Sequence, residues 1–115
     1  MTVGEAAEKL GLEILAGGEG LDREIHGVFC CDLLSLAMSR AKADDAWVTV
    51  MGNMNVVAVA ALTDVACAII AEGMNTDADT VEKALTQGVA LLCSGLPVFE
   101  TANAIYSLLN PERIV

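Results

Sequence analysis

The sequence is poor in aromatic and in basic residues. Aromatic residues make up 3% of its 115 residues and hydrophobic residues 55%, so the core must be built mainly from Ala, Val, Leu and Ile. Six basic residues stand against 16 acidic ones, which gives a formal net charge of −10. A chain of this charge is repelled by phosphate backbones and by anionic lipid headgroups. The composition therefore argues against nucleic acid and against a membrane surface as partners.

The sequence also lacks a hydrophobic run typical of a membrane span. The longest uncharged stretch, residues 46–63, approaches spanning length, but Gly52, Asn53 and Asn55 lie near its centre. The acidic N-terminus does not have the basic and then apolar pattern of a signal peptide. We therefore expect a cytoplasmic protein whose four cysteines stay reduced.

Several catalytic and metal-binding motifs are missing from the chain. It contains no G-x-x-x-x-G-K-S/T loop, no G-x-S-x-G motif, no zinc-binding helix and no C-x-x-C pair. The single histidine, His26, has no evident catalytic partner in the sequence. We expect a protein that is not an enzyme and that has no metal and no cofactor. The cysteines are interpreted as small hydrophobic residues of the core, at Cys30, Cys31, Cys67 and Cys93.

The stretch from Trp47 to Gly73 has the pattern of a strand, a polar turn, a helix and a second strand. The two predicted strands are Trp47–Met51 and Cys67–Ala71, and the predicted helix is Val56–Val65. Two strands joined by a helix in this way are parallel neighbours. Neither strand alternates polar and apolar residues, which favours burial on both faces of the sheet.

Short apolar runs and helix caps continue on both sides of this unit. The other predicted strands are residues 12–15, 25–30 and 89–93. The other predicted helices are residues 3–10, 33–42, 77–87 and 97–109. The Thr2–Glu5 capping box marks the start of the first, Asp32 that of the second, Thr76 or Asp77 that of the third, and Pro97 that of the last. Both apolar stripes of the 33–42 helix are expected to be covered. The order predicts one α/β domain over residues 1–115, with three α/β/α layers and a mostly parallel sheet of five to six strands.

Ligands of such sheets bind beyond the carboxyl ends of the strands. The residues predicted to contact a ligand there are Asp32, Asn53, Asn55, Gly73 and Ser94. Helix capping alone explains Asp32, Asn53 and Asn55. The alternative is that their polar groups contact a ligand, because a capped helix N-terminus also points at this edge.

Four segments resemble the DRTGG domain family: CDLLSLAM (31–38), WVTVMGNMNVVAVA (47–60), CAIIAEGM (67–74) and VEKALTQGVALLCS (81–94). The resemblance covers nearly the whole chain. It implies the fold of the N-terminal domain of HPr kinase/phosphorylase and of Mur ligases. It also implies a regulatory role, like that of the DRTGG domains of some phosphotransacetylases and of pyrophosphatases with CBS domains. Such relatives tend to pair, and a helix at 56–65 that is apolar on all sides also favours a homodimer.

The sequence departs from the family pattern at three places. The family's Thr-Gly-Gly falls on Ala71-Glu72-Gly73, where the Glu72 carboxylate would repel an anion at the strand end. Close relatives often carry a histidine at the position of Asn53. The only Asp-Arg pair, Asp22-Arg23, lies in a different loop from the one in the family's name motif.

These observations predict a non-catalytic regulatory or sensing module. It would bind a small ligand, with nucleotides and phosphorylated compounds as candidates, or a protein partner at the strand ends. Two alternatives remain open at this point. One is a remnant enzyme that acts on phosphorylated or nucleotide substrates, and the other is a pure protein-interaction subunit.

Overall fold

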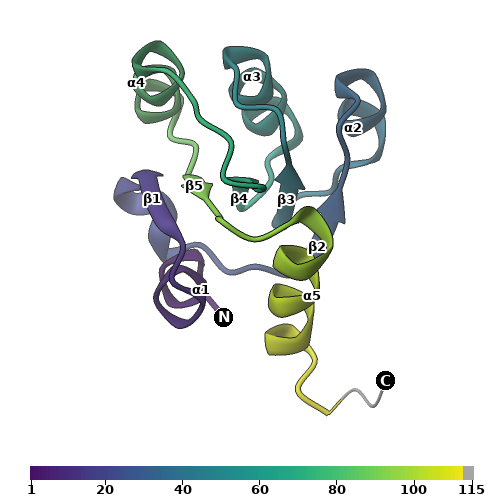
Figure 1. The fold of residues 1–115 in the computed structure, drawn as a ribbon. Helices are drawn as coiled ribbons and strands as arrows, with labels where there is room; N and C mark the ends of the chain where they lie inside the picture. Colours follow the sequence, from purple (N-terminus) through teal and green to yellow (C-terminus); the bar gives the residue numbers. More distant parts are fainter. Residues whose placement is uncertain (113–115) are drawn as a thin grey trace.

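Helices and strands alternate along the chain in the computed structural model, which describes residues 1–112 (Figure 1). The α-helices are α1 (Val3–Leu10), α2 (Leu34–Arg40), α3 (Met54–Thr63), α4 (Ala78–Gln87) and α5 (Val98–Leu109). The strands are β1 (Glu13–Ala16), β2 (Gly27–Cys30), β3 (Asp45–Thr49), β4 (Cys67–Ile70) and β5 (Leu91–Cys93). A short 3-10 helix, η1 (Gly18–Asp22), lies between β1 and β2.

The strands form one five-stranded sheet in the order β1-β5-β4-β3-β2. Strands β2 to β5 pair in parallel, and β1 pairs with β5 antiparallel. The β3–β4 register runs from Ala46 opposite Cys67 to Thr49 opposite Ile70, which confirms the predicted parallel pairing of the central unit. The order leaves β1 and β2 at the two edges of the sheet.

Helices cover both faces of the sheet, which confirms the three-layer architecture. Helices α2, α3 and α4 lie on one face, and α1 and α5 lie on the other (Figure 1). Each face has its own buried apolar cluster, and neighbouring residues of β3 contribute to opposite clusters: Trp47 to one and Val48 to the other. Burial on both faces is the reason why the central strands show no polar/apolar alternation.

Helix α3 begins two residues earlier than predicted, because Asn53 is its N-cap. The Asn53 Oδ1 atom accepts the backbone N–H groups of Asn55 (3.0 Å) and Val56 (3.2 Å). Asn55 is therefore not a cap, which corrects the second of the two capping assignments. The helix ends at Asp64, whose φ of 62° is left-handed and stops the helical path.

Helix α2 differs from its prediction in two respects. Its N-cap is Leu33, which makes no side-chain capping bond, so the assignment of Asp32 as the cap was wrong. The expectation that both apolar stripes are covered was also wrong, because only Ala37 of this helix is buried. The helix is short and packs beside α3 at the end of its layer, so large apolar side chains remain exposed at Leu33, Leu36 and Met38.

The other caps and the cysteines follow the predictions in part. The Thr2–Glu5 capping box is present, and Asp77, not Thr76, caps α4 through its bond to the Thr80 N–H. The interpretation of the cysteines as core residues holds for Cys67, which is fully buried, but Cys30 is exposed.

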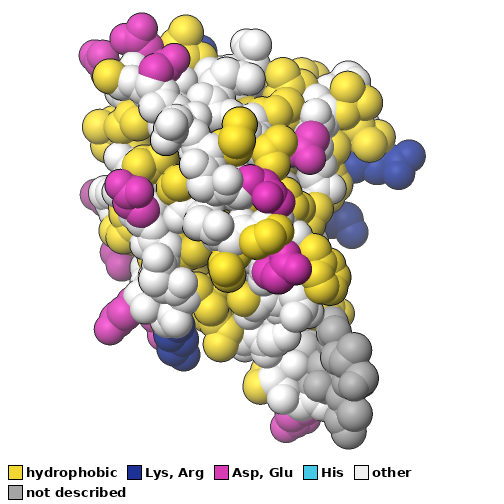
Figure 2. Space-filling view, in the orientation of Figure 1, with side chains coloured by type: hydrophobic (Ala, Val, Ile, Leu, Met, Phe, Trp, Pro, Cys, Tyr) yellow, Lys and Arg dark blue, Asp and Glu magenta, His cyan; other side chains and the backbone are white. Residues whose placement is uncertain are grey.

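Figure 2 shows exposed hydrophobic side chains lying between acidic ones on the face it presents. Within residues 1–112, no helix has the length and apolar character needed to cross a membrane.

Candidate functional site at the carboxyl edge of the sheet

The segments that follow β2, β3, β4 and β5 meet along one side of the sheet, which we call the carboxyl edge (residues 31–33, 50–55, 71–76 and 94–97). Hydrogen bonds tie neighbouring segments together. The Thr76 hydroxyl donates to the Gly52 carbonyl (2.7 Å), and the Gly73 N–H donates to the Ser94 carbonyl (2.9 Å). A Cβ atom at Gly52 would lie 2.7 Å from the Asn75 carbonyl oxygen, so a larger residue would force these two loops apart.

Asp32 connects the end of β2 to the end of β3. Its Oδ1 atom accepts the Thr49 hydroxyl (2.7 Å) and the Val50 N–H (2.8 Å). Thr49 is fully buried, whereas Asp32 is exposed. One oxygen of the carboxylate is thus directed into the fold. The other, Oδ2, accepts no hydrogen bond from residues 1–112. This second oxygen is an acceptor at the surface.

Asn53 and Asn55 lie at the N-terminus of α3, beyond the end of β3. The Asn53 amide oxygen is engaged in the cap, so its NH₂ group is the part left for other contacts. Both side chains are exposed, and the Asn55 side chain makes no hydrogen bond to the described residues. The α3 N-terminus thus presents amide donors and one amide acceptor to solvent.

The resemblance to DRTGG domains predicts a glycine at the position of Glu72. Its φ of 64° is left-handed, a conformation that glycine adopts without cost and a carboxylic side chain adopts with strain. The Glu72 Oε2 atom accepts the Val98 N–H (2.9 Å) in the first turn of α5. The protein therefore places its own anion at the N-terminus of α5, where the helix dipole favours negative charge.

Gly73 and Ser94 lie side by side but differ in accessibility. Gly73 is exposed, with a φ of 64° and open space where a Cβ atom would project. Ser94 has only 3% of its surface exposed, and its hydroxyl is bonded to the Thr101 hydroxyl (2.8 Å) and to the Leu96 N–H (3.1 Å). Ser94 thus fixes the turn between β5 and α5 from below the surface.

The five predicted site residues therefore all lie on the carboxyl edge, but they are not equally available. Asn53, Asn55, Gly73 and Asp32 are exposed there, and Ser94 is buried beneath them. Among residues 1–112, no three His, Cys, Asp or Glu side chains gather closely enough to hold a metal ion.

The sequence did not predict a groove that lies between β2 and α5. A cavity of about 360 Å³ lies between β2 and α5 and is lined by Val28, Cys30, Phe99, Ala102, Asn103 and Tyr106. The signal for it was present in the final helix. Phe99, Ala102 and Tyr106 repeat at helical spacing beside the core stripe that contains Ile105, and they form a second apolar face.

The fold places the protein in the class of small, mostly parallel α/β domains. The model of the DRTGG domain family matches residues 5–108. The chain belongs to the DRTGG domain family.

A solved structure with a similar fold is that of the CBS and DRTGG domains of the regulatory region of a Clostridium perfringens pyrophosphatase, in complex with its activator diadenosine tetraphosphate. The TM-score is 0.76 at 12% sequence identity, and the alignment covers 90% of the present chain. The present chain spans 45% of that structure's chain, so the two proteins correspond over a part of the larger one. No curated protein of known function matches the chain.

Proposed function

We propose that this domain is a non-catalytic regulatory module that binds a small nucleotide-like ligand at the carboxyl edge. The observation that carries this proposal is the grouping of exposed acceptors and donors on Asp32, Asn53 and Asn55 beside the open backbone of Gly73. Ligands of parallel α/β sheets bind beyond such strand ends. Membership of a family with a domain in the regulatory region of a pyrophosphatase supports a regulatory role.

The charge of the edge favours recognition of the sugar and base of the ligand over recognition of its phosphates. The Glu72 carboxylate already fills the N-terminus of α5, and the chain carries a net charge of −10. The free oxygen of Asp32 and the amide of Asn55 match the hydroxyl groups of a ribose and the polar edge of a base. Phosphates of the ligand would therefore extend into solvent.

The experiment is a thermal-unfolding screen with adenosine, AMP, ATP, diadenosine tetraphosphate and acetyl phosphate, followed by chromatography of each compound after incubation. We expect at least one nucleoside-containing compound to raise the melting temperature and to be recovered intact. Acetyl phosphate should have no effect, because it offers neither ribose nor base. Stabilisation accompanied by turnover would instead identify an enzyme.

Two variants provide matched tests of the site. Asn55→Ala removes an exposed amide that makes no hydrogen bond within residues 1–112, so it should abolish the ligand-induced shift and leave the unliganded protein intact. Gln87→Ala removes an exposed amide at the end of α4 and should leave the shift unchanged. Equal shifts in both variants would refute the assignment of the carboxyl edge.

We also propose that the protein forms a homodimer through the outer surface of α2 and α3. Helix α3 exposes an apolar stripe at i, i+4 and i+8, formed by Met54, Ala58 and Leu62, and Leu62 is 68% exposed. The exposed Leu36 and Met38 of α2 add to this surface, and isologous pairing would bury all of it.

Sedimentation equilibrium at micromolar concentration tests the dimer. The wild-type protein should sediment with twice the monomer mass, and Leu62→Lys should sediment as a monomer. Ile14→Lys, which places the same charge at an exposed apolar position on β1, should remain dimeric. A monomeric wild-type protein would contradict the proposal.

A further inference from the structure

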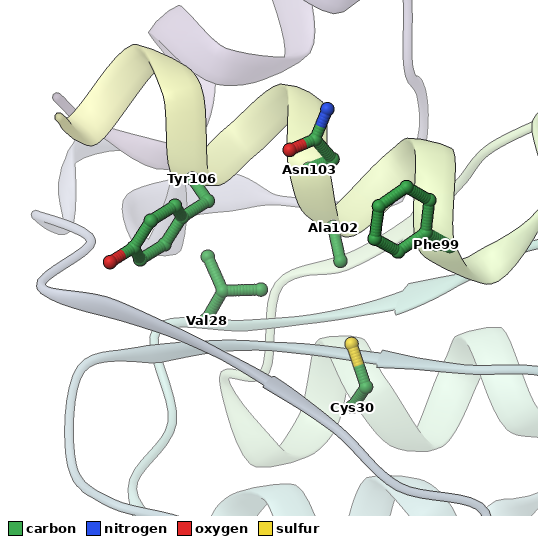
Figure 3. A pocket seen from close by; sticks show the side chains of 6 residues that line it. All are labelled: Val28, Cys30, Phe99, Ala102, Asn103 and Tyr106. Carbon is green, nitrogen blue, oxygen red and sulfur yellow. The ribbon is translucent and has the colours of Figure 1, made fainter. Parts of the chain in front are cut away.

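A groove follows the free edge of β2 over the whole length of the strand. The cavity between β2 and α5 adjoins a second one of about 410 Å³, because Val28 and Tyr106 line both. In Figure 3 the Val28 and Cys30 side chains project from the strand toward α5, and the rings of Phe99 and Tyr106 flank the space between them. We call the two adjoining cavities the β2 groove.

The backbone of β2 is paired on one side only. Strand β2 is the last strand of the sheet and pairs with β3 from Gly27 to Cys30. Cys31 donates its N–H to the Val48 carbonyl of β3 (3.3 Å). Because the hydrogen-bonding direction alternates along a strand, Val28 and Cys30 direct their N–H and C=O groups away from the sheet. Among residues 1–112, the outward donors and acceptors of Val28 and Cys30 therefore have no strand partner.

Aromatic side chains are concentrated along the β2 groove. The chain has four aromatic residues in total, and three of them line the groove: Phe29, Phe99 and Tyr106. Phe99 is 70% exposed, although burial is the usual state of such a side chain. Aromatic residues are enriched where proteins bind one another. A chain so poor in aromatics thus places most of them at one surface.

The two ends of the groove differ in charge. The apolar end contains Cys30 and Phe99, whereas His26, Arg40 and Lys42 line the other end. Neither Arg40 nor Lys42 forms a side-chain ion pair with a carboxylate of residues 1–112. The one acidic residue in this part of the groove, Asp45, is buried and accepts the Lys42 N–H. Arg40 and Lys42 therefore lack a negative partner among these residues, whereas the His26 Nδ1 atom lies 3.5 Å from the Asp44 carboxylate.

We propose that the β2 groove binds an extended segment of another protein, which adds to β2 as a new strand and carries an apolar residue and a carboxylate. Side chains of a strand point alternately to the two faces of a sheet. The apolar side chain would enter the cavity beneath α5. A carboxylate an odd number of positions away would face the α2 side, where Arg40 and Lys42 lie. Addition of a strand to an open sheet edge is an established mode of peptide recognition, in which main-chain bonds give affinity and side-chain pockets give specificity.

The test uses a phage-displayed library of random short peptides, selected against the full chain. Enriched peptides should share an apolar residue and an Asp or Glu at an odd separation. The most enriched peptide is then synthesised with a fluorescent label, and its affinity is measured by anisotropy. In ¹⁵N-labelled protein, saturation with this peptide should slow hydrogen exchange of the Val28 and Cys30 amides.

Three variants of the protein test the side-chain contacts. Phe99→Ser, at a largely exposed position, should weaken binding of the peptide about tenfold. Arg40→Glu should weaken it roughly fivefold, and more at low salt than at high salt. Lys9→Glu makes the same charge change on α1 and should alter binding less than about twofold. Native folding of each variant is verified from the emission of the single, buried Trp47.

Several results would overturn the proposal. These are a selection without enrichment, enriched peptides without a carboxylate, equal effects of Arg40→Glu and Lys9→Glu, and protection of amides outside β2. Slow exchange of the Val28 and Cys30 amides that depends on protein concentration in the absence of peptide would assign the groove to a second copy of the chain. Failure of the nucleotide screen has no bearing on this result, because the β2 groove and the carboxyl edge share no residue.

Discussion

Replacement of Asn53 by alanine should destabilise the fold through the loss of a single helix cap. The Asn53 Oδ1 atom satisfies two of the N–H groups that the start of α3 leaves without intrahelical partners, those of Asn55 and Val56. Loss of such a cap costs about 1 kcal/mol in the free energy of unfolding. For 115 residues the entropy of unfolding is about 0.24 kcal/mol/K, so the melting temperature should fall by about 4 °C.

The assay is urea unfolding followed by Trp47 fluorescence. Trp47 is the only tryptophan and is fully buried in the central strand, so its emission reports global unfolding. The midpoint should decrease at an unchanged slope, because the variant exposes the same surface on unfolding. Asn53→Asp keeps the acceptor and adds negative charge at a helix N-terminus, so its stability should equal or slightly exceed that of the wild type.

Asn55→Ala is the matched control for this prediction. Its side chain is exposed and makes no capping bond, so its free energy of unfolding should stay within about 0.5 kcal/mol of the wild-type value. Equal losses of stability in Asn53→Ala and Asn55→Ala would show that the specific cap of α3 contributes nothing.

Three further predictions concern a titrating cap, a buried thiol and a strained turn. The hydrogen bond to Thr80 lowers the pKa of Asp77, so Asp77 adds stability above its ordinary carboxyl pKa, and this stability is lost as the pH falls through the lower folded-state pKa. The Asp77→Asn variant keeps a cap, so its stability in urea unfolding should depend less on pH in the acid range, and an unchanged pH dependence would contradict this. Burial raises the pKa of the Cys67 thiol to about 12, so iodoacetamide should modify Cys67 only in urea but should modify the exposed Cys30 in the native protein. Mass spectrometry measures both modifications, and equal labelling of the two cysteines in the native protein would exclude the burial of Cys67. Glu72→Ala and Glu72→Gly both lose the hydrogen bond to the Val98 N–H, but only glycine adopts the left-handed φ without strain. Urea unfolding should therefore show Glu72→Ala to be about 1 kcal/mol less stable than Glu72→Gly, and equal stabilities would show that this turn stores no strain.

The fold could be predicted from the sequence because its central part depends on local signals that agree with one another. The uninterrupted apolar runs of β3 and β4 required burial on both faces, and the small-residue helix between them required a parallel pairing. Caps at Thr2 and Asp77 marked where two of the helices begin. These signals involve residues within a few positions of one another, so a single sequence contains them.

The details of the carboxyl edge could not be predicted, because they depend on contacts between distant segments. Asp32 looked like a cap, but the pairing of β2 with β3 brings it to Thr49, a stronger set of partners than its own helix offers. Ser94 follows β5 in the sequence as an exposed turn residue would, yet α5 folds over it and takes up its hydroxyl through Thr101.

The β2 groove has the same origin. Local periodicity gives the apolar residues of α5 but not the strand order, and only the strand order places β2 at the edge of the sheet. For the same reason the sequence could not show which apolar side chains of α2 stay exposed in the single chain, and these include Leu36 and Met38. A helix at the end of its layer has one helical neighbour, and a hydrophobic pattern does not reveal a helix's place in a layer.

The proposed role of the carboxyl edge is tested most directly by a ¹⁵N–¹H NMR titration of the full chain with the nucleoside compound that gives the largest thermal shift. We expect saturable shifts of the Asp32, Asn53, Asn55 and Gly73 signals, little change in β1 and α1, and a ligand spectrum that stays constant for the duration of the experiment. Shifts centred elsewhere, conversion of the ligand, or unchanged spectra with every compound of the panel would contradict it.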